Sequence, residues 1–285
     1  MLGRLIFADF GVKLSRKQKQ WFALDGKEMR GSIKKKETRG EALVQAVEHH
    51  SGAIQGQGYY QGNKESEIET GRQLMKESGL LGEKVTLDAL PCNPTTLEML
   101  AEKGTYVVGL KDNQKELKRV VSEEIASSEP IYATPQESEK QSGRLETRQY
   151  EVYEVEKVAK AQRWNQSGIK IAIQVERERI ELGSGKRSVE TSLYLSNESE
   201  DLPEVCHAIR KHWQVEVTNN LRDTTLAEDK LCVKETTVNR VLAGIRTLVL
   251  GLLRLTKCAN KKARLDNFAD NFGDLVCWLK SIHFL

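Results

Sequence analysis

The order of the predicted strands and helices constrains the fold of this chain more than any other feature. Between residues 20 and 126, apolar runs with strand periodicity alternate with amphipathic stretches of helical periodicity. The turn sequence His50-Ser51-Gly52 joins two of the strands as a hairpin. The predicted strands span 20–25, 41–50, 53–60, 84–88 and 105–110, and the predicted helices span 65–78, 95–103 and 113–126. The resulting order is β-β-β-α-β-α-β-α.

This order begins with antiparallel pairing and continues through α/β crossovers. It is the order of a ribonuclease-H-like α/β fold, in which a mixed sheet is flanked by helices. We therefore assign residues 20–127 to the first part of a ribonuclease-H-like core. Residues 1–19 precede it as a basic N-terminal segment.

The chain changes character at residues 127–143, a polar stretch with two prolines that predicts a linker or loop. Beyond it, alternating apolar positions predict strands at 145–155, 169–180 and 188–195. We expect residues 128–200 to form this linker and an inserted β-rich module.

Residues 201–285 are expected to supply the last part of the core and the C-terminal helices. One helix is predicted at 202–226, and a second, strongly amphipathic helix follows over 238–253. The apolar stripe of the second helix, which includes Val238 and Ile245, predicts packing against the core. A last helix is predicted within 265–285.

Three acidic residues stand in positions where acids are rare. Asp25 ends the apolar run of the first strand, Asp88 ends the fourth strand, and Glu216 falls on the apolar side of the helix at 202–226. Acidic side chains are depleted in strands and rarely lie on buried faces. Each of the three therefore needs a compensating partner, and a divalent cation is the simplest one.

Each acid also has a purely structural explanation. Asp25 stands before a glycine and could form a turn, and Asp88 could cap the helix that follows it. Glu216 could pair with Lys211 or Arg222 on the surface of its helix. Two-metal phosphoryl transfer, by contrast, needs hard oxygen ligands that converge from different elements. The three acids together, in this element order, favour a metal-dependent nucleic-acid enzyme.

Composition narrows the function classes only slightly. The formal net charge is +3, but residues 1–40 carry eleven basic and four acidic side chains, a net charge of about +7. Such a segment suits a polyphosphate backbone, although a solvated loop would look the same. The five cysteines are scattered without a CxxC pair, which argues against a zinc site and a disulfide framework and fits a reducing cytosol.

Seven segments, in order along the chain, carry a resemblance to a known family. They are ALDGKEMRGS at 23–32, KESEIE at 64–69, VTLDAL at 85–90, YVVGLKDNQ at 106–114, GRLETR at 143–148, IRKHWQVE at 209–216 and ED at 228–229. Together they resemble the DDE transposases of bacterial insertion sequences, in the H-repeat-associated branch.

The resemblance implies a ribonuclease-H-like catalytic core with a β-rich insertion, and metal-dependent DNA cleavage and strand transfer during transposition. By position, Asp25, Asp88 and Glu216 are implied as the catalytic and metal-binding residues. Mg²⁺ is the implied cofactor, with Mn²⁺ as a substitute and two ions in the site. The residues implied to bind DNA or to support the site are Lys27, Arg30, Lys111, Asn113, Arg210, His212 and Trp213.

The implied partners are double-stranded DNA, both as element ends and as target, and a second copy of the chain in a homodimer on DNA. No apolar run approaches the roughly 20 residues of a membrane span, so no membrane partner is expected. The expected location is the bacterial cytoplasm, with nucleoid association when DNA is bound.

Two departures from the family leave other functions open. The segment 217–223 differs from the usual sequence after the last acid, and only 24 residues precede Asp25 where relatives carry a helical region. The chain could therefore be a truncated, catalytically inactive DNA-binding remnant. A metal-dependent nuclease of the same fold, which cuts without joining, is a separate alternative, because the three acids alone do not distinguish it from a transposase.

Overall fold

The structure is a computed structural model in which two compact units can be described. The first unit combines Met1–Ser78 with Trp213–Leu285, and the second is Gly79–His212. The residues described are 19–33, 39–61, 64–141, 143–256 and 258–282. The basic N-terminal segment predicted at 1–19 lies almost entirely outside them.

The first unit is built on three antiparallel strands in the order β3-β2-β1. They are β1 (Trp21–Glu28), β2 (Glu41–Glu48) and β3 (Ile54–Gln61). The predicted turn joins β2 to β3, with Gly52 at a φ of +70°, a conformation that favours glycine. In this register Asp25 lies opposite Gln45.

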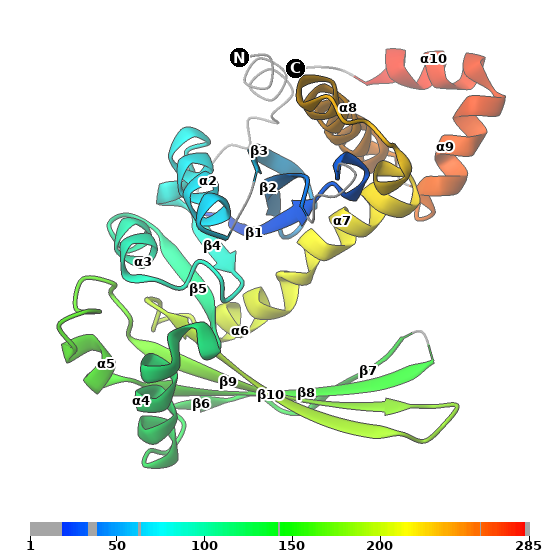
Figure 1. The fold of residues 1–285 in the computed structure, drawn as a ribbon. Helices are drawn as coiled ribbons and strands as arrows, with labels where there is room; N and C mark the ends of the chain where they lie inside the picture. Colours follow the sequence, from blue (N-terminus) through cyan, green and yellow to red (C-terminus); the bar gives the residue numbers. More distant parts are fainter. Residues whose placement is uncertain (1–18, 34–38, 62–63, 142, 257, 283–285) are drawn as a thin grey trace. The chain divides into compact units, whose positions relative to one another are not determined.

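Helices cover both faces of this three-stranded sheet. On one face lies α2 (Lys64–Glu77), where a Cβ added at Gly71 would lie 4.0 Å from Val44 Cγ1, an ordinary contact distance. On the other face, Ala23 and Val47 pack with Val215 of α7 (Trp213–Thr224). Since side chains alternate along a strand, Asp25 and Lys27 share this second face with Ala23. Figure 1 shows α2 and α7 on opposite sides of β1–β3.

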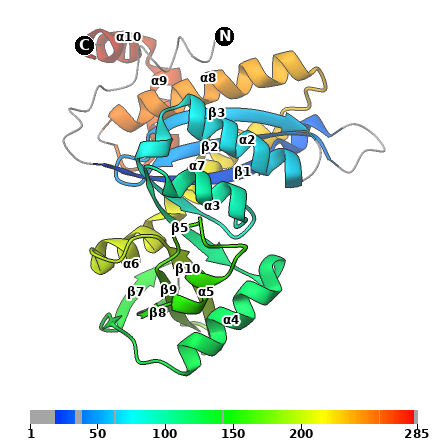
Figure 2. The same cartoon turned by 90° about the vertical axis from the view of Figure 1, so that its left-hand side faces the viewer.

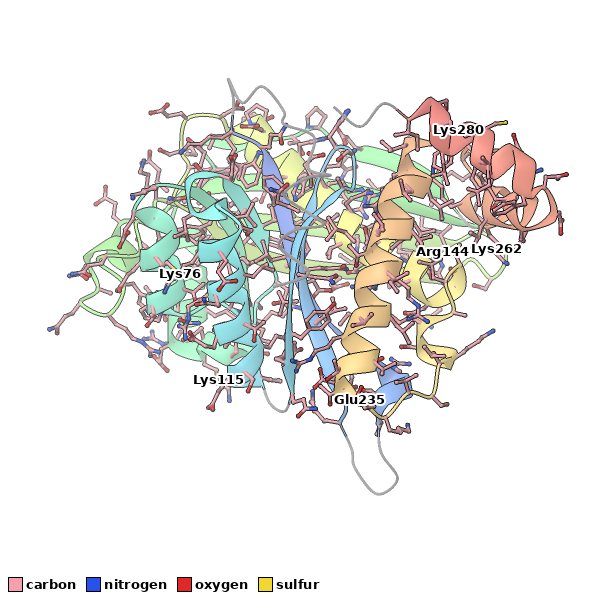
Figure 3. The ribbon with its side chains drawn as sticks, turned by 90° about the horizontal axis from the view of Figure 1, so that it is seen from above. Lys76, Lys115, Arg144, Glu235, Lys262 and Lys280 are labelled. Atoms are coloured by element: carbon pink, nitrogen blue, oxygen red, sulfur yellow. The ribbon has the colours of Figure 1, made fainter. Side chains whose placement is uncertain are left out.

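The helix α8 (Thr236–Leu255) covers the same second face, where its Ala243 packs with Met29 and Leu43. Glu235 caps this helix, because its carboxylate accepts hydrogen bonds from the backbone N–H groups of Thr237 and Val238. Figure 3 shows Glu235 at the start of α8. The remaining elements are η1 (Arg30–Ser32), η4 (Glu228–Lys230), α9 (Lys261–Asp270) and α10 (Phe272–Ser281).

The second unit contains a mixed sheet in the order β4-β5-β10-β9-β8-β6, with β7 also paired to β8. Figure 2 labels β5 and β7–β10 of this sheet. The strands β4 and β5 are parallel, and the other pairs are antiparallel. The strands are β4 (Lys84–Leu87), β5 (Thr105–Leu110), β6 (Tyr132–Ala133), β7 (Glu137–Gln141), β8 (Arg144–Glu154), β9 (Ile171–Glu181) and β10 (Arg187–Ser196). The helical elements are η2 (Leu80–Gly82), α3 (Pro94–Ala101), η3 (Asp112–Gln114), α4 (Lys115–Ala126), α5 (Glu156–Lys160) and α6 (Leu202–Lys211).

The predicted fold class, a mixed α/β sheet flanked by helices, is confirmed. The last strand of the predicted β-rich module, β10, pairs with β5, so the module shares one sheet with a core strand. The stretch predicted as a linker at 127–143 is not all loop, since β6 and β7 lie in it. Short charged strands such as β7 lack the apolar alternation that would reveal them. The segment boundaries 20–127, 128–200 and 201–285 stay a prediction.

Three helix predictions need correction. The helix predicted at 202–226 is two helices, α6 and α7, which meet at His212. The last helix is also two, α9 and α10. In α8, the buried residues are Asn239, Ala243, Thr247, Leu250 and Leu253. Val238 and Ile245, which were predicted to pack in the core, are 48% and 50% exposed.

Candidate active site

Asp25 occupies the middle of β1, whereas the sequence predicts it at the end of a strand. The strand continues through Gly26 to Glu28, so the Asp-Gly pair is not a turn. The carboxylate is half-buried on the face covered by α7. Its Oδ2 accepts a hydrogen bond from Nδ2 of Asn219 on α7, at 3.3 Å. Asp25 is therefore fixed between a strand and a helix.

Glu216 lies in the first turn of α7 and is exposed, although the sequence predicts it on the apolar side of its helix. The buried face of α7 is formed by Val215, Thr218 and Arg222 instead. Asn219, which contacts Asp25, follows Glu216 by three residues, so the two side chains lie on neighbouring parts of the helix surface. This arrangement puts the turn that carries Glu216 beside Asp25.

Asp88 lies in the second unit, directly after β4, as the sequence predicts. Its side chain is exposed, and its Oδ1 accepts a hydrogen bond from the backbone N–H of Leu90 at 2.7 Å. Asp88 does not cap the next helix, because Asn93 is the N-cap of α3 and accepts a hydrogen bond from the Thr96 N–H. The carboxylate therefore closes a local turn at the end of a buried strand.

The loop after Asp88 is held from the segment that follows β5. Nδ2 of Asn113 donates to the Ala89 carbonyl at 2.6 Å, and Nε2 of Gln114 donates to the Cys92 carbonyl at 2.8 Å. A Cβ atom at Gly109 would lie 3.1 Å from the Ala89 nitrogen, a tight contact with the backbone, so glycine allows the close approach of this loop. Asn113 thus supports the Asp88 loop, and Gly109 and Gln114 do the same.

Lys27, two residues after Asp25, is buried in a cluster of acids. Its Nζ lies 2.7 Å from Asp223, 3.4 Å from Asp229 and 3.9 Å from Glu228. The lysine side chain is only 6% exposed. Three carboxylates surround one ammonium group here, so Lys27 supports the fold of the first unit and does not face solvent.

Arg222 supplies the second cation of this cluster, and it is fully buried. Its guanidinium binds both carboxylate oxygens of Glu228, at 2.8 and 2.7 Å. It also donates to the Thr247 hydroxyl and to the Ala243 carbonyl of α8. Arg222 therefore ties α7, η4 and α8 together and does not pair with Glu216.

His212 marks the junction of α6 and α7. Its Nδ1 lies 2.8 Å from the Thr86 hydroxyl of β4. Burial lowers the pKa of His212 to about 4, against the opposing effects of the Asp88 charge and the Thr86 contact. The imidazole is therefore neutral near pH 7. Trp213, the next residue, is 53% exposed.

The three remaining residues of the predicted DNA-binding set, Arg30, Lys111 and Arg210, differ in how far their side chains are exposed to solvent. The Arg30 side chain is 77% exposed, although its guanidinium approaches Asp229 at 3.9 Å. Lys111 is also exposed. Arg210 donates to Glu139 of β7 at 2.7 Å. Among these three, Arg30 and Lys111 present their charges to solvent most openly.

Comparison with known proteins identifies the family. The family model described as "Transposase DDE domain" matches residues 16–252. The chain belongs to this family. It is also similar to the protein named "Putative transposase YncI" of Escherichia coli O157:H7, with 25% identity over 270 residues that cover 91% of this chain and 68% of that protein. The predicted transposase function is thereby confirmed, and the H-repeat-associated branch stays a prediction.

Membership of the transposase DDE domain family carries general properties. The family implies nuclease and transferase activity and binding to DNA, and its members generally use divalent metal ions. None of the helices in the described part of the chain has the length and hydropathy that a membrane crossing requires.

The described residues contain no group of three or more His, Cys, Asp or Glu side chains that is gathered to hold a metal ion. Asp25 and Glu216 belong to the first unit and Asp88 to the second. The assignment of these three as the metal-binding residues of this transposase is therefore a proposal, for which the local geometry of each unit supplies the support.

Several supporting residues were missed at the sequence level. Asn219, Gln45, Arg222 and Gln114 each make contacts that hold Asp25, α7 or the Asp88 loop. Their partners lie up to 194 residues away along the chain. Gln114 and Gly109 fall inside the segment YVVGLKDNQ, which could have suggested a supporting role for them.

Proposed function

We propose that this transposase cleaves DNA strands and joins them to a target, with Asp25, Asp88 and Glu216 as the ligands of its divalent cations. One observation carries the proposal beyond family membership. On the α7-covered face of β1, Asp25 contacts the turn of α7 that also bears Glu216. Two of the three acids thus come from neighbouring elements of one unit, as a shared metal site requires.

The donor chemistry fits Mg²⁺. Carboxylate oxygens are the protein ligands that this ion prefers, and it completes its coordination with waters and substrate phosphate oxygens. Asp88 and Glu216 are exposed and Asp25 is half-buried, so solvent reaches each of the three side chains. When bound, such cations activate the attacking oxygen and stabilise the leaving oxygen of a phosphodiester. Three carboxylates supply enough oxygens for two ions, with Mn²⁺ as a substitute.

In this proposal the protein's residues position the metal-binding carboxylates and form no covalent bond with DNA. The β1 backbone and the Asn219 amide fix Asp25. The Leu90 N–H and the Asn113 amide fix Asp88 and its loop. Preorganised charges of this kind stabilise a phosphoryl-transfer transition state without a protein nucleophile.

DNA contact is assigned to the exposed members of the predicted set, Arg30, Lys111 and Trp213. Exposed cations release counterions when they bind phosphates, which produces affinity that falls with salt. Lys27 and His212 are excluded from this role, since their side chains are engaged in the acid cluster and with Thr86. They act as supporting residues.

A homodimer on DNA is part of the proposal, and the exposed stripe of α8 supports it. Its apolar residues follow one another at alternating spacings of three and four residues, as in helices that pack against a second copy of themselves. Its members are the exposed Val238, Val241, Ile245 and Leu255 and the half-buried Leu248 and Leu252. In light scattering with DNA bound, Ile245→Glu should halve the measured protein mass per complex, and an unchanged mass would refute this surface.

The test of the function uses labelled DNA with candidate element ends, an unlabelled target plasmid and Mn²⁺. A transposase yields labelled strands joined to the target. Cleaved ends without joined products would favour the simple nuclease of the same fold. Cleavage at wild-type rates by Asp88→Asn would show that Asp88 is not a ligand, and no activity in the wild-type chain would favour the inactive remnant.

A further inference from the structure

A chain of two amides leads from the sheet to Asp25. Nε2 of Gln45 donates to Oδ1 of Asn219 at 2.5 Å, and Nδ2 of Asn219 donates to Oδ2 of Asp25 at 3.3 Å. Gln45 is fully buried on β2, opposite Asp25 in the strand register. Asn219 comes from α7, so the chain of hydrogen bonds joins both strands to the helix.

The direction of this chain is set by the charge of Asp25. An ionised carboxylate can only accept hydrogen bonds, so Asn219 must turn its NH₂ group toward Asp25. Its oxygen then faces Gln45, which must donate in turn. Oε1 of Gln45 is buried and has no hydrogen-bond partner among the described residues. An unsatisfied buried acceptor costs free energy. This cost indicates that the orientation of the Gln45 amide is set by its hydrogen bond to Asn219.

Asn219 offers Asp25 a neutral hydrogen-bond donor, whereas a lysine or arginine in its place would also bring a positive charge. A lysine or arginine beside Asp25 would neutralise the carboxylate and compete with a metal ion, as Lys27 does for the acids around it. The Asn219 amide restrains one carboxylate oxygen of Asp25 and adds no positive charge of its own. Outer partners of this kind orient the ligands of metal ions and raise their affinity.

We propose that Asn219 is a positioning residue, oriented by Gln45, that holds the Asp25 carboxylate for a divalent cation. The proposal rests on the function proposed above. The role of Asn219 is inferred from its contacts with Gln45 and Asp25 alone.

The test is calorimetric titration of the full chain with Mn²⁺, in the absence and presence of DNA. Asn219→Ala should bind Mn²⁺ about 10–100-fold more weakly than the wild type. Asn220→Ala is the matched control, because Asn220 is an exposed residue of the same type one position further along α7, and its affinity should be unchanged. Gln45→Met, similar in volume, frees the Asn219 amide to turn and should give a smaller loss.

The outcomes separate the two proposals. Wild-type affinity in both Asn219→Ala and Gln45→Met would overturn the positioning role while leaving the proposed function intact. Absence of Mn²⁺ binding by the wild type, even with DNA, would overturn both. If Asn219→Ala does not fold, as judged by circular dichroism, the Gln45→Met titration decides. Equal losses in Asn219→Ala and Asn220→Ala would also contradict the proposal, since they would reflect α7 as a whole.

Discussion

Two acidic regions on the same face of the β1–β3 sheet are stabilised in opposite ways. In one, Asp223, Glu228 and Asp229 surround Lys27, and Arg222 binds Glu228 with both arms of its guanidinium. In the other, the Asp25 carboxylate is held by the neutral amide of Asn219. Lys27 and Asp25 are only two residues apart on β1 and point the same way.

This difference indicates different uses of negative charge. Buried acids that are matched with cations contribute to stability and hold elements together, and they have no charge left for a ligand. The hydrogen bond from Asn219 to Asp25, by contrast, orients the carboxylate without adding a positive charge. The structural acid cluster around Lys27 and the candidate catalytic carboxylate Asp25 thus lie only two residues apart along β1.

The largest expected effect sharpens this comparison on the catalytic side. Loss of a residue that only orients a metal ligand typically costs about 10–100-fold in activity. Glu216→Gln should lower the rate of DNA cleavage by more than this, because it removes a proposed ligand. The free energy of unfolding should stay unchanged, since the side chain is exposed and the volume is conserved. Cleavage kinetics and urea denaturation measure the two quantities. Wild-type cleavage by this variant would remove Glu216 from the site.

The second prediction concerns the structural side. Arg222→Met should lower the free energy of unfolding by about 3–5 kcal/mol, because buried Glu228 loses its partner. The double variant Arg222→Met with Glu228→Gln should recover part of this loss. Lys262→Met, at an exposed pair with Asp266, is the control and should change little. A loss at Arg222 no larger than the control would break the distinction between the two regions.

The third prediction separates Lys27 from Arg30. Lys27→Met should destabilise the chain by about 3 kcal/mol while leaving the salt dependence of DNA binding unchanged. Arg30→Met should leave stability unchanged and reduce the slope of log affinity against log salt by about one, as expected when one phosphate contact is lost. Denaturation and DNA titrations at several salt concentrations give these values. The reverse pattern would make Lys27 a DNA contact.

The smallest effect is a pH dependence. The folded pKa of His212, about 4, lies below the unfolded value of about 6.5, so the unfolded chain takes up the proton first. Stability from this group is therefore present above pH 6.5 and is lost as pH falls from about 6.5 to 4. His212→Asn should flatten this part of the stability curve. An NMR titration that places the imidazole pKa near its ordinary value would contradict the account.

Much of the fold could be predicted because its signals are local. The strand at 105–110 has the predicted limits, and Asp88 follows its strand as expected. Periodicity shows which residues share a helix face but not where that face points. For this reason Ile245 was predicted in the core, and Glu216 on the apolar side of its helix, although both are exposed.

Contacts between distant residues could not be predicted in the same way. The Lys27 cluster joins residues about 200 positions apart, and no local pattern distinguishes a buried lysine from one that faces DNA. The roles of Asn219 and Gln45 could not be predicted either, since an isolated amide residue in a sequence indicates neither a contact nor a partner. Their roles follow only from the packing of α7 on β1 and β2.

The central claim is that Asp25 holds a divalent cation, and the most direct measurement is Mn²⁺ binding by calorimetry to the wild type and to Asp25→Asn, with DNA present. The account predicts binding by the wild type that is lost or at least tenfold weaker in the variant, because a ligand charge is removed. Equal binding by both proteins, at the same stoichiometry, would contradict it.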